Sequence, residues 1–223
     1  MPANQSHAAE AVLPLKGMPP VNRDWTSLGL PEKGWVMVTD KTQCTLCPKP
    51  EDRACVSACA GTHNLKREAR LAMGVCEQCD PAPCEDACPI EAVSRTEQGI
   101  VEVDQELCIG CQFCVDVCPS GALVVVDPYA VPTPAVGMTN YSSGRPSGEL
   151  PGTVAKCTFC AYRLLDGLLP VCVDACPHGA IWIGNMERNT ATNGLRVIRL
   201  GDLLGRRKYE VAEHGNRVID LID

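Results

Sequence analysis

The chain has few aromatic residues and no long apolar run, and these two absences limit the folds open to it. Its 223 residues include only two Phe, three Trp and four Tyr, so a large aromatic core cannot form. No hydrophobic stretch approaches the roughly 20 residues of a membrane-spanning helix, so we expect no direct membrane span. Eighteen prolines and nineteen glycines indicate short elements joined by many turns.

The signatures of several functional classes are also missing. There is no G-x-G-x-x-G loop for a flavin or nicotinamide and no radical-type C-x3-C-x2-C motif. A formal net charge of −7 argues against a nucleic-acid partner. The first thirty residues lack the basic and apolar regions of a signal peptide. We therefore expect a cytoplasmic or membrane-peripheral chain, and export together with a signal-bearing partner stays open.

Cysteine is abundant, and all sixteen cysteines fall into four quartets. Each quartet opens with C-x2-C and closes with C-x3-C. The third, CIGCQFCVDVCP, is the ferredoxin run C-x2-C-x2-C-x3-C-P. No cysteine remains as a catalytic nucleophile, so we expect a non-catalytic chain. The quartets are Cys44, Cys47, Cys55 and Cys59; Cys76, Cys79, Cys84 and Cys88; Cys108, Cys111, Cys114 and Cys118; and Cys157, Cys160, Cys172 and Cys176.

Two other uses of cysteine fit this pattern poorly. Structural zinc takes four tetrahedral ligands, usually from two well-separated pairs, and three cysteines in one seven-residue run overfill such a site. Disulfide frameworks belong to small secreted chains. The sequence therefore predicts four [4Fe-4S] clusters. Each oxidised cluster adds about −2 in charge, which brings the loaded protein to roughly −15.

The fourth cysteine of a ferredoxin run ligates the cluster of another run, so the quartets are expected to exchange ligands. We predict that the second quartet exchanges ligands with the third, and the first with the fourth. The first and fourth quartets resemble each other in carrying a long insert between their second and third cysteines, of seven and eleven residues. Sequential pairing, first with second and third with fourth, is the alternative. The predicted sets are site 1 (Cys44, Cys47, Cys55, Cys176), site 2 (Cys76, Cys79, Cys84, Cys118), site 3 (Cys108, Cys111, Cys114, Cys88) and site 4 (Cys157, Cys160, Cys172, Cys59).

Strands are predicted around the quartets. One covers 35–38, and a hairpin joins 92–95 to 100–103 through the turn at 96–99. The segments CPIEA, CPSGA and CPHGA are three copies of one Cys-Pro turn, and the last two lead into predicted strands at 121–127 and 179–184. Toward the C-terminus we expect strands at 195–200, 208–211 and 217–222, with a helical turn at 202–207.

Three motifs and the tail resemble a known family. The motifs CEQCDPAPCEDACP (76–89), CIGCQFCVDVCP (108–119) and CTFCAYRLLDGLLPVCVDACP (157–177), with the tail LLGRRKYEVAEHGNRVIDL, are similar to the four-cluster electron-transfer subunits of the DMSO reductase superfamily. The likeness covers roughly residues 35 to 223. It implies the exchanged pairing, a catalytic partner with molybdenum or tungsten on a pterin, and often a membrane subunit linked to quinone.

The resemblance also implies an α+β fold of two nested, ferredoxin-like units that carry two clusters each. The corresponding division is 34–66, the first motif of the outer unit; 67–127, the inner unit; 128–156, a Pro/Gly-rich insertion; and 157–223, which completes the outer unit. Residues 1–33 are expected to form an extended arm, either a disordered tail or, as we favour, a strap on a partner subunit. A free polyferredoxin that acts as a diffusible carrier is the alternative function.

The first quartet departs from the family pattern. The segment CTLCPKPEDRACVSAC carries an insert before its third cysteine, and Ala60 stands where the other quartets have proline. Four cubane clusters are still expected in the chain. Among other residues near the quartets, His178 could hydrogen-bond a cluster, and Lys156 and Arg163 could moderate its charge or be solvated.

Overall fold

The computed structural model describes residues 34–47, 49, 53–63, 65, 70, 74–129, 150–165, 167–205, 207–211 and 217–222. All sixteen cysteines lie within these ranges. The predicted arm at 1–33 and residues 130–149 of the predicted insertion lie outside them.

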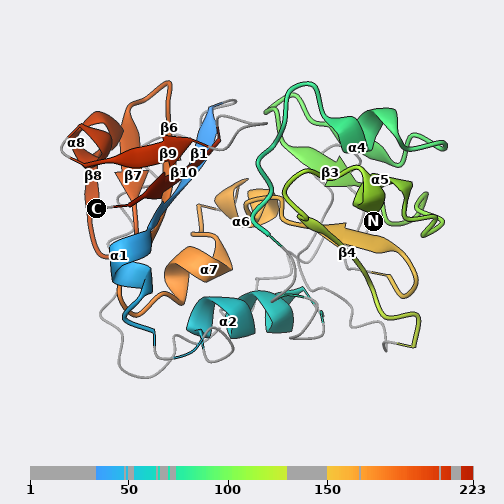
Figure 1. Cartoon of the computed structure of the whole chain (residues 1–223), viewed down its shortest axis with the longest axis horizontal. Helices are drawn as coiled ribbons and strands as arrows, with labels where there is room; N and C mark the ends of the chain where they lie inside the picture. The colour runs from blue at the N-terminus through green and yellow to red at the C-terminus, as the bar shows by residue number, and fades with distance from the viewer. Residues whose placement is uncertain are drawn as a thin grey trace, which may run out of the picture.

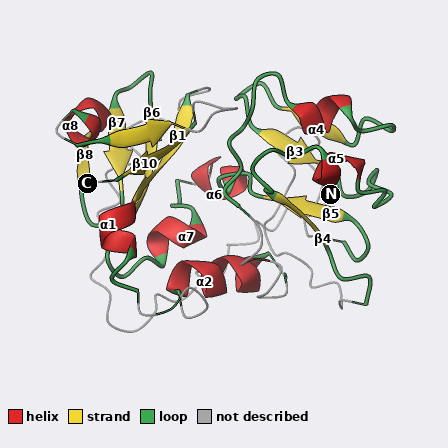
Figure 2. Cartoon of the chain, in the orientation of Figure 1, coloured by secondary structure: helices red, strands yellow, loops and turns green. Residues whose placement is uncertain are grey.

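The elements are short, as the proline and glycine content predicts (Figure 2). In chain order they are β1 (Trp35–Asp40), α1 (Lys41–Cys44), α2 (Ala54–Thr62), α4 (Pro83–Asp86), β2 (Val93–Arg95), β3 (Val101–Val103), α5 (Phe113–Asp116), β4 (Leu123–Val125), β5 (Val154–Lys156), α6 (Ala161–Leu165), α7 (Val171–Asp174), β6 (Ile181–Asn185), β7 (Thr190–Thr192), β8 (Val197–Arg199), α8 (Leu200–Leu204), β9 (Tyr209–Val211) and β10 (Val218–Leu221). Among the described residues, none of the helices is long and apolar enough to cross a membrane.

A six-stranded sheet in the order β8-β7-β6-β1-β10-β9 unites the two ends of the described chain. In Figure 1 the blue strand β1 lies among the red strands from the C-terminal region. It pairs antiparallel with β6 and parallel with β10. The backbone N–H of Asp40 donates to the carbonyl of Ala180 at 2.7 Å. Because β1 leads into the first quartet and β6 follows the fourth, this pairing brings those two quartets together.

Both faces of β1 are buried, which follows from its apolar sequence WVMV. Trp35 and Met37 face one core, with Phe159 and Leu164 from the α6 region. Val36 and Val38 face the other core, which includes Leu200 and Leu203 of α8. The alternation follows the two-residue period of a strand. The sheet is thus held between α8 on one face and the fourth-quartet segment on the other.

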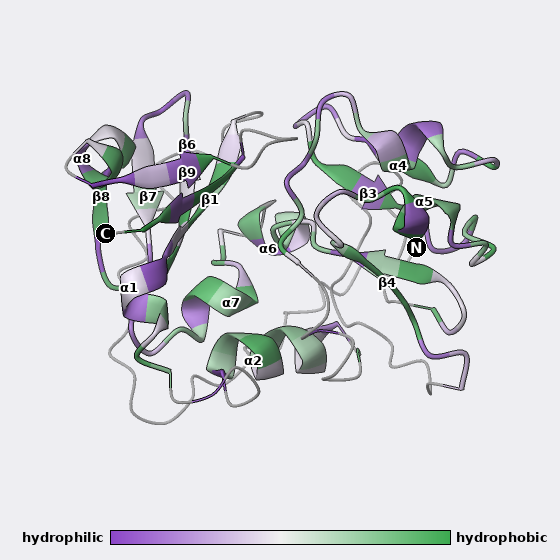
Figure 3. Cartoon of the chain, viewed as in Figure 1, coloured by the Kyte–Doolittle hydropathy of each residue, from purple (hydrophilic) through white to green (hydrophobic). Residues whose placement is uncertain are grey.

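The second and third quartets occupy a separate lobe, drawn in green in Figure 1. There α4 and α5 lie beside the β2–β3 hairpin and the two-stranded β4–β5 sheet. Its core contains Val93, Val101, Leu123 and Val154 together with cysteine side chains. Figure 3 shows hydrophobic ribbon in both lobes, for example in β1 and α7 of one and in β3 and β4 of the other.

The strands predicted from the sequence are confirmed, each with slightly different bounds. The pairing of β2 with β3 confirms the hairpin, with Val93 opposite Val103. The helical turn expected at 202–207 is α8, which begins two residues earlier. Sequence reasoning did not predict β5 and β7. The strand β5 falls inside the predicted insertion at 128–156, where three residues after a Pro/Gly-rich stretch carry too little pattern to reveal a strand.

Candidate iron–sulfur cluster sites

The loops of the second, third and fourth quartets share one backbone feature. The residue just before the second cysteine has a left-handed backbone in each: Gln78 (φ 54°), Gly110 (φ 69°) and Phe159 (φ 55°). A left-handed residue reverses the local chain direction, so that successive cysteines can face a common centre. At position 110 glycine is required, because an added Cβ would lie 1.9 Å from the carbonyl oxygen of Gly152.

The three Cys-Pro turns are also one structural repeat. In each, the backbone N–H of the alanine four residues after the last cysteine donates to its sulfur. The distances are 3.2 Å for Ala92 to Cys88, 3.2 Å for Ala122 to Cys118 and 3.3 Å for Ala180 to Cys176. An N–H directed at sulfur stabilises its anionic form, which is the form that binds metal. The short helices α4, α5 and α7 end directly before these turns.

The first quartet is built differently. Cys55 and Cys59 both lie in α2, four residues apart and therefore on one helix face. The N–H of His63, four residues after Cys59, donates to the Cys59 carbonyl at 2.9 Å instead of to its sulfur. Ala60 takes part in the helix, where proline would not fit. The missing Cys-Pro turn is thus replaced by a helix.

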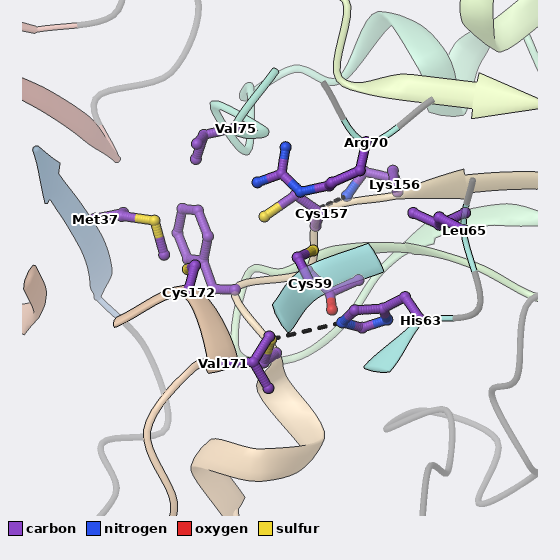
Figure 4. Close-up of a pocket in the computed structure, with 13 residues that line it drawn as sticks. Met37, Cys59, His63, Leu65, Arg70, Val75, Lys156, Cys157, Val171 and Cys172 are labelled. Carbon is purple, nitrogen blue, oxygen red and sulfur yellow. Dashed lines mark hydrogen bonds between the residues drawn. The ribbon is translucent and has the colours of Figure 1, made fainter. Parts of the chain in front are cut away.

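Four thiols from two quartets line one pocket, which we call the Cys157 pocket (Figure 4). It encloses about 430 Å³ of empty space, open solvent included. Its sulfur-bearing wall consists of Cys59 from the first quartet and Cys157, Cys160 and Cys172 from the fourth. These are the four residues of predicted site 4.

Basic side chains also line the Cys157 pocket. Figure 4 shows Arg70 and Lys156 beside Cys157, with His63 on another side of the pocket. The His63 Nε2 lies 3.7 Å from the Cys160 sulfur. Burial raises the pKa of the Cys59 thiol, and the charges of His63 and Arg70 act in the opposite direction. The pocket therefore favours anionic sulfur more than burial alone would allow.

A second pocket, the Cys76 pocket, has about 300 Å³ of empty space, open solvent included, and is lined by the residues of predicted site 2. Cys76, Cys79 and Cys84 come from the second quartet and Cys118 from the third. Burial raises the pKa of Cys79 to about 11, with the thiol of Cys76 as the next cause. Apolar walls from Val101 and Leu123 complete the pocket.

The remaining thiols also lie near the partners that exchange predicts. Burial raises the pKa of Cys55, and the nearby thiols of Cys176 and Cys44 raise it further. These three belong to predicted site 1, and Cys47 lies one turn beyond Cys44 with its N–H 3.3 Å from the Cys44 carbonyl.

In the third quartet, burial raises the pKa of Cys114 to about 11. The thiols that raise it further belong to Cys108, Cys84, Cys88 and Cys111. All but Cys84 are residues of predicted site 3, and Cys84 belongs to site 2.

The thiol groups succeed one another in space. Gln78, which lies between Cys76 and Cys79, donates through its Nε2 to the Cys157 carbonyl at 3.2 Å, so the Cys76 pocket adjoins the Cys157 pocket. Cys114 belongs to the same packed cluster as Cys84, which links the Cys76 pocket to the third quartet. The link from the Cys157 pocket to the first quartet runs through α2, which carries both Cys55 and Cys59. The groups therefore follow the order site 1, site 4, site 2, site 3.

The donor set fits an iron–sulfur cluster. Thiolate is the ligand of such clusters, and each pocket supplies four thiols with apolar walls. Within the described residues, no three His, Cys, Asp or Glu side chains converge as the ligands of a single metal ion do. The four irons of a cubane spread their ligands further apart than one ion does, so thiols that surround a space rather than a point suit it.

Of the other residues singled out in the sequence, Lys156 is buried and Arg163 is structural. Arg163 Nε donates to the Leu169 carbonyl at 2.6 Å, and its guanidinium lies 3.6 Å from Asp174, so it holds the long insert of the fourth quartet. His178 is exposed to solvent, in keeping with a surface histidine. Arg70 and Gln78 were missed, since nothing in their sequence positions signals burial against thiols.

The pockets and the repeated Cys-Pro turns define a [4Fe-4S] protein of the ferredoxin class, and comparison with known proteins agrees. The 4Fe-4S binding domain model matches residues 101–124. The chain is 32% identical over 212 residues to a selenate reductase subunit of Mesobacillus selenatarsenatis, in a match that covers 79% of this chain and 70% of that protein. It is 30% identical over 179 residues to a tetrathionate reductase subunit of Salmonella typhimurium.

It is also 38% identical over 117 residues, or 52% of this chain, to the iron–sulfur subunit assigned to a dimethyl sulfoxide reductase in Halobacterium salinarum. The match to this protein spans 43% of its length. The match to the tetrathionate reductase subunit spans 61% of that subunit's length and 71% of this chain. The chain belongs to this family of reductase iron–sulfur subunits, whose function is electron transfer.

Proposed function

We propose that this chain relays electrons through four [4Fe-4S] clusters between a molybdenum- or tungsten-pterin catalytic subunit and a second redox partner, a quinone-linked membrane subunit or a soluble carrier. The observation that carries the proposal is the mixed origin of the Cys157 pocket. Its thiols come from quartets separated by about a hundred residues, as exchange between the first and fourth quartets requires. The names of the relatives, subunits of selenate and tetrathionate reductases, support the catalytic partner.

When bound, a [4Fe-4S] cluster would store one electron at a time. The chain's own residues do the rest. Thiolates hold each site in place, and the N–H groups of Ala92, Ala122 and Ala180 lower the cost of negative charge on sulfur. Apolar walls such as Val101, Phe159 and Leu123 exclude water from the two pockets. With the sites in the order 1, 4, 2, 3, sites 1 and 3 would be the two ends of the row and would exchange electrons with the two partners.

We also propose the exchanged ligand sets in full, and paired ligand variants test them. Under exchange, Cys59 and Cys172 serve the same cluster, so the double variant Cys59→Ser/Cys172→Ser should disturb one cluster signal. Under sequential pairing it should disturb two. The double variant Cys59→Ser/Cys84→Ser has the reverse expectation, two signals under exchange and one under sequential pairing. Electron paramagnetic resonance of reduced protein, together with iron analysis, counts the disturbed clusters. The reverse pattern in both variants would exclude the exchanged sets.

The subunit assignment has its own test. A complex purified through this chain should contain a pterin and molybdenum or tungsten in stoichiometric amount. A chain that purifies alone, and that several unrelated reductases can reduce at similar rates, would instead be a free polyferredoxin.

A further inference from the structure

Lys156 is a buried cation whose hydrogen bonds within the described part of the chain are to neutral groups. It is the last residue of β5 and is only 7% exposed. Its Nζ donates to the carbonyl of Val101 and, at 3.0 Å, to the carbonyl of Cys157. Over the same described residues, no ion pair joins it to a carboxylate. A buried charge with neutral partners alone is unfavourable, so a negative group is expected nearby.

Two predicted cluster sites supply that negative charge. Lys156 lines the Cys157 pocket, as Figure 4 shows. It is also paired with Leu123 across the β4–β5 sheet, and Leu123 lines the Cys76 pocket. The Val101 carbonyl, to which Lys156 donates, belongs to a residue that lines the Cys76 pocket. Lys156 is therefore shared between sites 4 and 2.

Gln78 fixes the position of the Lys156 side chain. Its side chain is 1% exposed. Its Oε1 accepts from the Val101 N–H at 2.8 Å, and its Nε2 donates to the Cys157 carbonyl at 3.2 Å. Gln78 and Lys156 thus hold the same two residues, Val101 from β3 and Cys157 from the fourth quartet. The closed network leaves the ammonium group little freedom to leave the gap between the two sites.

Arg70 has a similar position between sites 4 and 1. It lines the Cys157 pocket together with Cys59, Cys157 and Cys172, as Figure 4 shows. Cys55, a residue of predicted site 1, lies on the same face of α2 as Cys59, so the cation that lines the pocket beside Cys59 also adjoins site 1. In contrast, no basic residue is among those that line the Cys76 pocket in the described part of the chain.

We propose that Lys156 and Arg70 are positioning charges that raise the reduction potentials of the clusters they adjoin. Lys156 acts on sites 4 and 2, Arg70 acts on sites 4 and 1, and site 4 alone responds to both. The inference rests on the proposed function, in that clusters occupy these sites. Reduction adds one negative charge to a cluster, and a buried cation in contact with the site stabilises the reduced form more than the oxidised form. Site 3 lies beyond both cations and keeps its potential.

The test is a potentiometric titration of the full chain, purified anaerobically with its clusters and followed by electron paramagnetic resonance. Lys156→Met and Arg70→Met each remove one charge, and Lys208→Met, at an exposed lysine beside the edge strand β9, is the matched control. Each of the first two variants should lower two of the four potentials. The expected change is at least about tenfold in the equilibrium constant for reduction, which is about 59 mV for one electron. One component should shift in both variants, and Lys208→Met should shift none.

Two further variants separate charge from hydrogen bonding. Lys156→Gln keeps a donor and removes the charge, so it should shift the same two components as Lys156→Met. Lys156→Arg keeps the charge and should stay within about threefold of the unmodified protein. If both neutral variants lose iron while Lys156→Arg retains it, the requirement for charge is confirmed. If Lys156→Arg loses iron as well, the role is steric and the proposal is wrong.

The proposal is also overturned if iron-loaded Lys156→Met and Arg70→Met have the potentials of the control, or if no component responds to both. These failures differ from failure of the proposed function. In that case the unmodified chain itself would show no reducible iron–sulfur signal.

Discussion

Replacement of Gly110 by alanine should damage the third-quartet loop by an amount that the structure allows us to estimate. Gly110 has φ +69°, a conformation that costs an L-residue about 1–2 kcal/mol. The new Cβ would also lie 1.9 Å from the backbone oxygen of Gly152, so one of the two segments must move. Overpacking of this kind costs a further 1–3 kcal/mol or so. Gly110→Ala should therefore lower the free energy of unfolding by about 2–5 kcal/mol.

Gly121 is the matched control for this prediction. It has φ +60°, yet a Cβ added there meets nothing within 4 Å. Gly121→Ala should cost only the conformational part, about 1–2 kcal/mol. Urea unfolding of the two iron-loaded variants, followed by cluster absorbance and circular dichroism, measures the difference. Equal losses in the two variants would refute the reasoning, because the close approach of Gly152 would then carry no energy.

Three further predictions concern the iron and the first quartet. Iron and sulfide analysis of anaerobic protein should give about sixteen iron atoms per chain, and about twelve would mean that one quartet holds no cubane. Protein stripped of iron should show no cooperative thermal transition, because the cysteine-centred cores lose their organising groups; a sharp transition in iron-free material would contradict this. Asp40→Asn should weaken the start of α1 by roughly 1.5–3 kcal/mol, because Asp40 accepts from Gln43 N at 3.1 Å and from Arg207 at 2.5 Å. Burial acts to raise the pKa of Asp40, but hydrogen bonds from Arg207 and Thr42 leave the pKa below its usual value. The stability that ionised Asp40 contributes is therefore present above about pH 4 and is lost as the pH falls through the lowered pKa. An unmodified protein whose stability does not change between about pH 5 and pH 2 would exclude this contribution.

The features carried by local spacing could be predicted from the sequence. The Cys-Pro turns, the β2–β3 hairpin and β1 each depend on residues within a few positions of one another, and all are present in the structure. The α+β class and the ferredoxin character follow from the same motifs. Local spacing does not decide between exchanged and sequential pairing of the quartets, because that depends on contacts between segments far apart in the chain.

The long-range features could not be predicted because no local pattern encodes them. The parallel pairing of β1 with β10 joins residues about 180 positions apart, for example Met37 with Val218. Lys156 stands next to a predicted ligand, but a lysine in that position is equally typical of a solvated side chain. Its burial depends on Val101 and Gln78, which the sequence gives no reason to place beside it.

The first quartet shows most clearly where pattern and structure disagree, and it yields a final prediction. Comparison with the other three quartets suggests that Ala60→Pro would restore a Cys-Pro turn. In the structure Ala60 lies inside α2, which spans Ala54–Thr62 and carries Cys55 and Cys59 on one face. Proline there removes a helical hydrogen bond and clashes with the preceding turn, at a cost of about 3 kcal/mol or more.

Ala60→Pro should therefore lower the thermal stability of the iron-loaded protein and speed the loss of iron. Gly61→Ala is the matched variant one residue on. An added Cβ meets nothing there within 4 Å, and alanine favours a helix over glycine by about 1 kcal/mol, so this change should raise stability. Thermal unfolding and iron retention of both variants provide the measurement. If Ala60→Pro stabilises the protein and Gly61→Ala does not, the segment forms a Cys-Pro turn like the other three, and the helical account of the first quartet fails.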